Sequence, residues 1–366
     1  MKRRSLYLAA AALCIAAPAL GDEGRIPLAG PAVITTPGHY IVTRSFAAPP
    51  VGHAILIRAN DVVVDLNGQL LTQSAISREV IAIDLDYVTR GIVIRNGSLS
   101  GGQAGIGTIT TDVSGTELAD LSVEKVEISG SRYGVSVAAL AVEVISCHIH
   151  DVIFGGITLG GSATGIVARI VDNVIVGPGG VGISLFAGRA SEIRGNKVTG
   201  FTPSAAAAGS GAITVMSAGG VSASGGHLVE ANQVTLPAGA TGDGIALVTS
   251  GFGGEVGPAN LVLRNVVRGA GRFGIYSYLN NTRIEGNVVS NSMSDGIHVG
   301  NAGAFGPPLA GFYNVVVANQ VAANGGCGVT FGNTNFHMYR DNFAPGNGGG
   351  GYCDPGFPNI LGPLNF

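Results

Sequence analysis

The sequence predicts an all-β protein whose chain winds into a solenoid of three parallel sheets. Three observations support this prediction. Strand-forming Val and Ile recur throughout, a Gly-(Ile/Val) signature returns at intervals of 22 residues or more, and an Asn-x-(Val/Ile/Phe) signature alternates with it. Branching at Cβ favours extended backbone, whereas runs of the helix formers Ala, Leu, Glu and Lys are scarce.

The composition excludes several other classes of protein. The chain has 366 residues, including 60 Gly and no Trp, with 12% charged residues and a formal net charge of −3. A nucleic-acid-binding protein normally carries a basic stripe, so we expect no nucleic-acid partner. We also expect no transmembrane segment in the mature chain, because no stretch after the N-terminal segment is apolar for the roughly 20 residues that a membrane helix needs.

Residues 1–21 have the pattern of a cleaved signal peptide. Basic residues at positions 2–4 precede an apolar stretch over residues 6–20, and a small-x-small motif ends at Gly21. We expect cleavage near Gly21 and a secreted or periplasmic mature protein; the alternative is a short membrane anchor. In the mature chain we expect an N-terminal cap and lead-in over 22–50, the solenoid over 51–345, and a Gly/Pro-rich C-terminal tail or cap over 346–366. Such covers protect the open edges of stacked sheets from pairing with other chains.

The Gly-(Ile/Val) signature marks the start of each predicted coil. Its copies are separated by 22, 26, 29, 33, 30, 22 and 32 residues, which indicates a fixed coil of about 22 residues with insertions in some turns. Such a coil accommodates three short strands and stacks on the next coil at about 4.8 Å, which buries Ile and Val in a continuous column. We attribute the Gly to the backbone freedom that a sharp turn into a strand requires. The copies begin at Gly134, Gly156, Gly182, Gly211, Gly244, Gly274, Gly296 and Gly328.

The Asn signature falls later in each coil, and Cys147 fills the same position in an earlier coil. We expect Asn to adopt the left-handed conformation at a tight bend, and its amide to hydrogen-bond to the equivalent amide of the next coil. A propeller or sandwich would need regular Asn-Gly or Asp-Gly hairpin turns, which the sequence lacks. The copies are Asn173, Asn196, Asn232, Asn265, Asn287, Asn319 and, more weakly, Asn342.

The sequence resembles the right-handed parallel β-helix proteins of the pectate-lyase-like superfamily, which have the pectin lyase fold. Residues 37–42 and 55–68 carry part of the resemblance, and the two repeats carry the rest. The resemblance implies a single-stranded right-handed parallel β-helix in which the Gly-Ile strand belongs to the first sheet and the Asn turn lies between the second and third. Family members with activity usually act on polysaccharides, with sites on the outward face of the first sheet.

A candidate site lies on that face in the second half of the chain, where outward and turn positions become acidic, basic and aromatic on successive coils. Long turns at 204–209, 217–226, 249–260 and 301–311 point to the same region, because long loops on a rigid scaffold commonly form ligand walls. The catalytic candidates are Asp243, Arg272, Tyr276, Asp295 and His298, and Tyr278 is the candidate for substrate binding by stacking on a sugar ring.

Two kinds of chemistry fit these residues. A glycoside hydrolase needs two carboxylates, and Asp243 and Asp295 lie two coils apart, a backbone separation of about 9–10 Å that suits an inverting enzyme. A lyase or epimerase needs a base for the proton next to a uronate carboxyl, here Tyr276 or His298, and a cation, here Arg272. No catalytic signature of the polygalacturonases or pectate lyases is present, and Asp-Gly-Ile is also an ordinary turn-to-strand sequence.

The first hypothesis for function is therefore an exported protein that binds, and as a lyase, hydrolase or epimerase modifies, a polysaccharide along the first sheet. The rival is a non-enzymatic β-helix rod for adhesion, assembly or partner binding, which the low content of charged residues favours. A role in copper-enzyme maturation ranks last, because no Met or His array supports copper binding. The sequence names no cofactor.

Two further groups of residues are notable. Lys125, Glu127, His148, His150 and Asp151 occupy neighbouring positions, and we expect a solvated face with local ion pairs. His148 and His150 share one face of a strand, but two ligands without a third do not make a metal site. Mature cysteines are odd in number, so at least one is unpaired. Pairing of Cys327 with Cys353 would require a distorted last coil and is left open.

Overall fold

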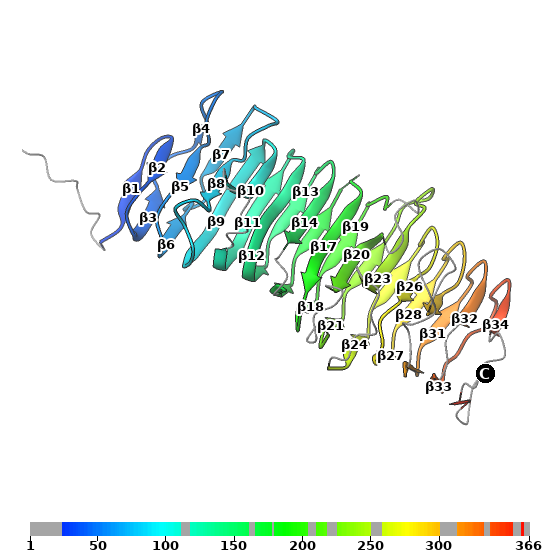
Figure 1. Ribbon diagram of the computed structural model, residues 1–366. Helices are drawn as coiled ribbons and strands as arrows, with labels where there is room; N and C mark the ends of the chain where they lie inside the picture. The colour runs from blue at the N-terminus through cyan, green and yellow to red at the C-terminus, as the bar shows by residue number, and fades with distance from the viewer. Residues whose placement is uncertain are drawn as a thin grey trace, which may run out of the picture.

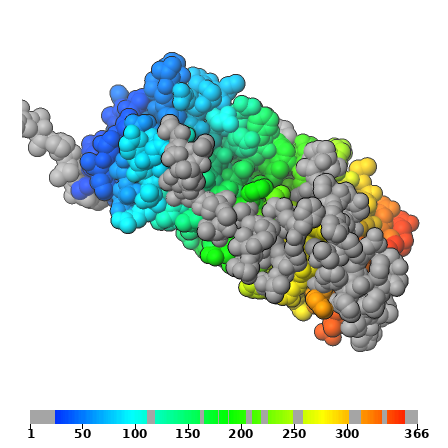
Figure 2. All heavy atoms as spheres, viewed as in Figure 1, coloured from blue at the N-terminus to red at the C-terminus, as the bar shows by residue number. Residues whose placement is uncertain are grey.

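The computed structural model describes residues 24–110, 118–160, 165–177, 179–203, 210–217, 225–249, 258–300, 313–332, 337–353 and 360–361. The described chain forms one elongated rod, with β1 (Ile26–Leu28) near one end and β34 (Gly350–Cys353) at the other (Figures 1 and 2). Every strand pairing is parallel. The described residues contain no helix able to cross a membrane. The signal-peptide prediction at 1–21 falls outside them.

The strands form three parallel sheets that follow one another around each coil, as the sequence predicts. The first sheet contains β2 (Ala32–Ile34), β5 (Ile55–Ile57), β8 (Ile81–Asp84), β10 (Ala104–Ile109), the start of β12 (Tyr133–Ile145), β14 (Gly155–Gly160), β17 (Val181–Gly188), β20 (Gly211–Ser217), β23 (Asp243–Thr249), β26 (Ile275–Ser277), β29 (Ile297–Val299), β32 (Cys327–Phe331) and β34. The second contains β1, β3 (Gly38–Val42), β6 (Val62–Asp65), the first parts of β9 (Ile92–Gly101) and β11 (Leu118–Ser129), the end of β12, β15 (Val167–Val171), β18 (Glu192–Arg194), β21 (Leu228–Glu230), β24 (Asn260–Leu263), β27 (Thr282–Glu285), β30 (Val315–Val317), β33 (Met338–Arg340) and β35 (Ile360–Leu361). The third contains β4 (Phe46–Ala47), β7 (Leu70–Gln73), the ends of β9 and β11, β13 (His148–His150), β16 (Val174–Val176), β19 (Lys197–Thr199), β22 (Gln233–Thr235), β25 (Val266–Arg268), β28 (Val288–Ser290) and β31 (Gln320–Ala322).

The core is a set of stacked aliphatic columns that run along the rod. In the first sheet, the Ile or Val of each signature copy is fully buried and lies in register with its equivalent in the next coil. Neighbouring coils thus bury one another's apolar side, which no single coil could do. One such column is Val135, Ile157, Ile183, Ile213, Ile245, Ile275, Ile297 and Val329.

The signature glycines are required for a different reason from the one predicted. Gly244, Gly274 and Gly296 are not among the described residues with positive φ. A Cβ at Gly274 would instead overlap Val289 and lie 2.7 Å from the carbonyl oxygen of Gly296, and Gly244 and Gly296 are equally crowded. Glycine is needed here because the first sheet passes close to a side chain of the third sheet.

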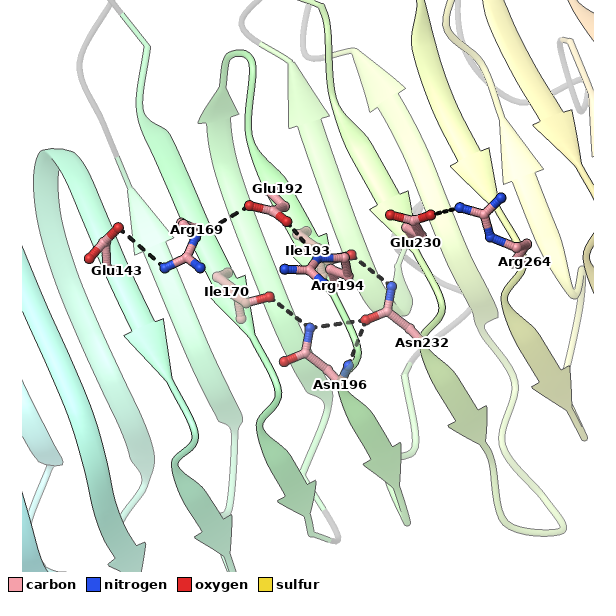
Figure 3. A network of polar contacts seen from close by, with 10 residues as sticks. All are labelled: Glu143, Arg169, Ile170, Glu192, Ile193, Arg194, Asn196, Glu230, Asn232 and Arg264. Carbon is pink, nitrogen blue, oxygen red and sulfur yellow. Dashed lines mark hydrogen bonds and ion pairs between the residues drawn. The ribbon is translucent and has the colours of Figure 1, made fainter.

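The predicted asparagine ladder is confirmed. Each Asn from Asn173 to Asn319 donates its side-chain amide to the Asn Oδ1 of the next coil at 2.8 to 3.0 Å, and also to a backbone carbonyl, as Asn196 does to Ile170 (Figure 3). Cys147 occupies the same slot, because its N–H donates to Asn173 Oδ1 at 2.9 Å.

The predicted left-handed conformation falls one residue earlier than expected. The bend is at the residue before each Asn, and the Asn itself is not among the described residues with positive φ. Asn is selected at this position for its amide, which satisfies backbone groups at a buried turn, and not for its backbone freedom. The left-handed residues are Ser146, Asp172, Gly195, Ala231, Arg264, Gly286, Ala318 and Asp341.

A second polar ladder lies at the entry to the second sheet. Its members accept hydrogen bonds from backbone N–H groups of the preceding coil. Asn260 accepts from His227 at 3.2 Å, and Asn314 accepts from Thr282 at 2.7 Å. His227 is fully buried within this ladder, and its Nδ1 accepts the N–H of Ser191 at 3.4 Å. Buried histidine thus substitutes here for an amide acceptor.

The C-terminal coil is tied to the coil before it. Cys327 and Cys353 form a disulfide with Cα atoms 6.0 Å apart, which answers the question left open by the sequence. Gly350, with φ +105°, pairs with Cys327 of β32 in the first sheet. Cys147 is free and buried, and burial raises the pKa of its thiol to about 11. The cap assignments of 22–50 and 346–366 stay predictions.

Candidate functional site

The predicted site residues stack on neighbouring coils of the first sheet. Tyr276 lies in register between Ala246 and His298, so these outward positions form one column. In the adjacent column of turn positions, Asp243 is followed by Phe273 in the next coil and by Asp295 in the coil after that. The carbonyl oxygen of Asp295 accepts the N–H of Gly274. The register expected from the repeat is confirmed.

Asp243 and Arg272 form a buried, bidentate ion pair. Arg272 Nε and Nη2 donate to the two carboxylate oxygens at 2.8 and 2.5 Å, and the N–H of Phe273 donates to Oδ1 at 3.2 Å. The Asp243 side chain is fully buried, while that of Arg272 is 21% exposed. Burial raises the pKa of Asp243, although Arg272 acts against this rise. Both oxygens of Asp243 are occupied, so its carboxylate orients Arg272.

Asp295 and His298 form a second polar pair. The side chain of His298 meets Asp295 Oδ2 through Nδ1 at 2.9 Å, and the N–H of Cys327 donates to Asp295 Oδ1 at 2.8 Å. Burial raises the pKa of Asp295, but the hydrogen bonds from His298 and Cys327 outweigh it and hold that pKa below its ordinary value. An ionised Asp295 holds the proton of neutral His298 on Nδ1, which leaves a lone pair on Nε2.

Among the predicted site residues, His298 has an unusual atom, its Nε2. It is buried and has no hydrogen-bond partner among the described residues. Most buried side-chain nitrogens and oxygens are hydrogen-bonded, and an exception calls for an explanation such as a catalytic role or an absent ligand. This imidazole nitrogen is therefore available to a molecule that enters the site.

Aromatic rings connect the two polar pairs. Phe273 stacks on His298 with ring centroids 4.3 Å apart, and Tyr276 lies 5.8 Å from His298. The Arg272 guanidinium lies over both rings, 4.8 Å from the centroid of Phe273 and 5.3 Å from that of Tyr276. These contacts fix the direction of the guanidinium and add cation–π attraction. Arg272, Tyr276 and His298 thus belong to one cluster of contacting side chains.

A small apolar cluster adjoins these groups outside the main core. Ala246, Val248, Phe273 and Tyr276 are its buried members, with Met216 and Tyr278 partly buried against it. Burial raises the pKa of the Tyr278 hydroxyl. Tyr278 lies at the margin of the cluster, which suits its predicted contact with substrate. The long turns predicted to wall the site lie largely outside the described residues.

Sequence reasoning located the polar residues but missed how they are paired. It grouped Asp243 with Asp295 as two carboxylates, whereas each has a different basic partner. It did not name Phe273 as a site residue, although this ring stacks on His298. The hydrogen bond from the backbone N–H of Cys327 to Asp295 could not be predicted from the sequence.

A separate hollow of about 560 Å³ lies near the N-terminal end of the first sheet. Its lining includes His53, Arg58 and Arg78, and none of the predicted site residues. It takes no part in the chemistry considered below.

Comparisons with known proteins agree with this fold. A family model described as a right-handed β-helix region matches residues 133–306. No curated protein sequence matches the chain.

Solved structures give further matches. The chain is similar to the A-module of the mannuronan C-5 epimerase AlgE4 of Azotobacter vinelandii, with 14% identity over 93% of this chain and 91% of that one, at a TM-score of 0.57. It is also similar to the periplasmic alginate epimerase AlgG, with 15% identity over 84% and 76% of the two chains and a TM-score of 0.54. A tailspike protein of E. coli bacteriophage HK620, solved with a pentasaccharide, shares 12% identity over 92% of this chain and 58% of the tailspike chain, with a TM-score of 0.51. The chain has the fold of a right-handed parallel β-helix.

Proposed function

We propose that this protein acts on a uronic-acid-containing polysaccharide by removing the proton next to the sugar carboxyl group, as a lyase or an epimerase. The observation that carries the proposal is the unpartnered, buried Nε2 of His298, whose ring is oriented by Asp295. A base of this kind must present a lone pair at a fixed position, and the carboxylate on Nδ1 provides that.

The other groups have matching roles in this proposal. Arg272 binds the substrate carboxyl group and stabilises the anion that forms when the C5 proton leaves. Its Nε and one N–H of Nη2 donate to Asp243, so Nη1 and the second N–H of Nη2 are the donors left for substrate. Tyr276 lies against both Arg272 and His298 and supplies a proton, either to the opposite face of C5 or to the departing oxygen at C4. Tyr278 stacks on a neighbouring sugar ring.

Hydrolysis fits the geometry less well. It requires one carboxylic acid and one carboxylate that both reach the glycosidic bond. Asp243 is fully buried and engaged through both oxygens by Arg272, and Asp295 is engaged by His298 and by the N–H of Cys327. Neither Asp243 nor Asp295 is therefore free to act as the acid or the base of a hydrolase.

The similar structures guide the choice of first substrate. Two of them are named as alginate or mannuronan epimerases. At 14–15% identity they share the fold with this chain, and their names support testing a uronic-acid polymer before a neutral one. Export to the periplasm or the medium, which polysaccharide substrates would require, is part of the same proposal.

The test is solvent exchange at C5. The purified mature protein is incubated in D2O with mannuronan, alginate or polygalacturonate. Proton NMR then follows deuterium uptake and epimerisation, and ultraviolet absorbance follows unsaturated products. We expect uptake with at least one polymer, and a loss of about 10²–10⁴-fold in His298→Ala, because that is the usual contribution of a positioned base. Asp295→Asn should also slow the reaction, and Arg272→Lys should raise KM for the polymer.

The control is His39→Val, which replaces a histidine of β3 by the residue that faces it in β6, Val63. It should leave the rate unchanged. No exchange and no product with any polymer, from protein that melts cooperatively, would contradict the proposal and favour the non-enzymatic rod.

A further inference from the structure

A second group of polar residues lies on the outward side of the third sheet, four coils before the site described above. Glu127 of β11 faces His148 of β13, and Ser129 faces His150, in register. The two histidines are two residues apart on one strand, so their side chains project to the same side. Parallel pairing then brings the carboxylate of Glu127 to both imidazoles.

The three side chains already lie close enough to share an ion. One ligand atom from each of Glu127, His148 and His150 lies within 4.8 Å of the other two. His150 Nε2 is 3.3 Å from Glu127 Oε1. Two ligands of a tetrahedral Zn²⁺ with bonds of about 2.0–2.1 Å are about 3.3–3.4 Å apart, so this edge needs no adjustment. The other two edges, from His148 to Glu127 and to His150, would close by rotation of the exposed His148 side chain.

Further groups orient these ligands from behind. Asp151 Oδ2 lies 2.8 Å from His150 Nδ1, which directs the Nε2 lone pair of His150 toward Glu127. The Ser98 hydroxyl donates to Glu127 Oε2 at 3.0 Å, which leaves Oε1 to face the histidines. A carboxylate on the far nitrogen of a ligating histidine is the usual support of a metal site, since it fixes the tautomer and raises ligand basicity.

We propose that Glu127, His148 and His150 bind a divalent transition metal, of which Zn²⁺ fits best, with water completing the coordination. Two imidazoles and one carboxylate suit zinc better than calcium or magnesium, which prefer oxygen ligands. Because Glu127 belongs to one coil and the histidines to the next, the ion would link adjacent coils. The proposal is independent of the polysaccharide chemistry proposed for the first sheet.

The experiment is a titration of untagged, chelator-treated protein with ZnCl₂ by calorimetry, with Co²⁺ absorption as a second readout of coordination. We expect one equivalent bound, with the visible spectrum of a tetrahedral or five-coordinate Co²⁺ site, and a rise in melting temperature on adding Zn²⁺. His148→Val and His150→Val introduce the residues found in register in the next coil, Val174 and Val176, so they should fold normally. Each should lower affinity by more than the roughly 10–100-fold expected for Asp151→Asn, which removes only the supporting charge.

His39→Val is again the matched control and should bind one equivalent as the parent does. Failure of the parent protein to bind Zn²⁺ or Co²⁺ would overturn the proposal. Unchanged affinity in both His148→Val and Glu127→Gln would also overturn it, because the ion would then lie elsewhere on the chain.

Discussion

At the scale of single residues, two positions per coil are constrained for reasons that lie in neighbouring strands. The signature Gly is needed because Val289 and its equivalents press against the first sheet. The Asn is needed because its amide bonds to backbone groups of the preceding coil and to the Asn side chain of the next coil. Neither constraint can be inferred from the backbone conformation of the residue itself. A substitution at either position therefore acts across coils.

Asn232→Ala should lower the free energy of unfolding by about 2–4 kcal/mol, because several buried groups would each lose a hydrogen bond worth about 1–3 kcal/mol when left unsatisfied. Asn232 donates to Ile193 O at 2.8 Å and accepts both the N–H and the side-chain amide of Asn196 at 3.0 Å. Chemical denaturation measures the change, with the exposed neighbour Gln233→Ala as control. Equal stabilities of the two variants would refute the account of the ladder.

Gly274→Ala should destabilise by about 1–3 kcal/mol, as overpacking usually does. The new methyl would overlap Val289, so Val289→Ala in the same chain should recover part of the loss; the rest remains because Gly296 O lies 2.7 Å away. Gly160→Ala is the matched control, since nothing lies within 4 Å of its Cβ position. If the double variant is no more stable than the sum of the single changes predicts, the steric explanation is wrong.

At the scale of elements, hydrogen-bonded ladders matter more than the exposed ion pairs beside them. Figure 3 shows both, with Arg169 between Glu143 and Glu192 on the surface and the Asn ladder beneath. Exposed pairs of this kind contribute about 0–1 kcal/mol, whereas a buried ladder controls whether polar turns can enter the core at all. In the second ladder, the buried side chain of His227 has the same role as an asparagine amide.

His227 should make the protein sensitive to acid. Burial lowers its pKa to about 4, while an unfolded histidine titrates near 6.5. The unfolded chain therefore binds the proton first, so stability is full above pH 6.5 and falls by about 3 kcal/mol as pH drops from 6.5 to 4. His227→Asn places in this ladder the residue that the next coil uses, Asn260, and should remove that part of the loss. Denaturation at pH 7 and pH 5 compares the two proteins; parallel losses would exclude His227 as the cause.

At the scale of the whole molecule, each coil contacts only its neighbours, so stability is distributed along the rod. The disulfide between Cys327 and Cys353 acts at one end. It closes a sequence separation of 26 residues, which corresponds to about 3–4 kcal/mol by chain entropy.

Cys353→Ser should loosen the C-terminal coils and leave the N-terminal ones unchanged. Hydrogen exchange followed by mass spectrometry should show faster exchange in residues 337–353, with no change in 55–83. Reducing agent should have the same effect on the parent protein and none on the variant. Faster exchange along the entire rod would mean that the coils unfold as one unit.

The sequence predicts the fold in detail because the repeat itself encodes it. The column through Tyr276 and His298 and the slot filled by Cys147 follow from spacing alone, and both are confirmed. Partnerships between coils are harder to predict, because insertions of variable length separate the partners. The pairing of Asp243 with Arg272 is a case of this kind, whereas the proximity of Glu127 and His148 is expected from the sequence and confirmed by their register.

The uniform register of the coils also has an evolutionary meaning. Val174 lies opposite Lys197, so excision of residues 174–196 would join Asn173 directly to Lys197 and remove one strand from each sheet. The Asn ladder would reconnect from Asn173 to Asn232, and the rod would shorten by about 4.8 Å. Duplication of the same segment would lengthen it by as much. Rod length in this architecture can thus change in whole steps through unequal recombination, while Asp295 and His298 keep their surroundings.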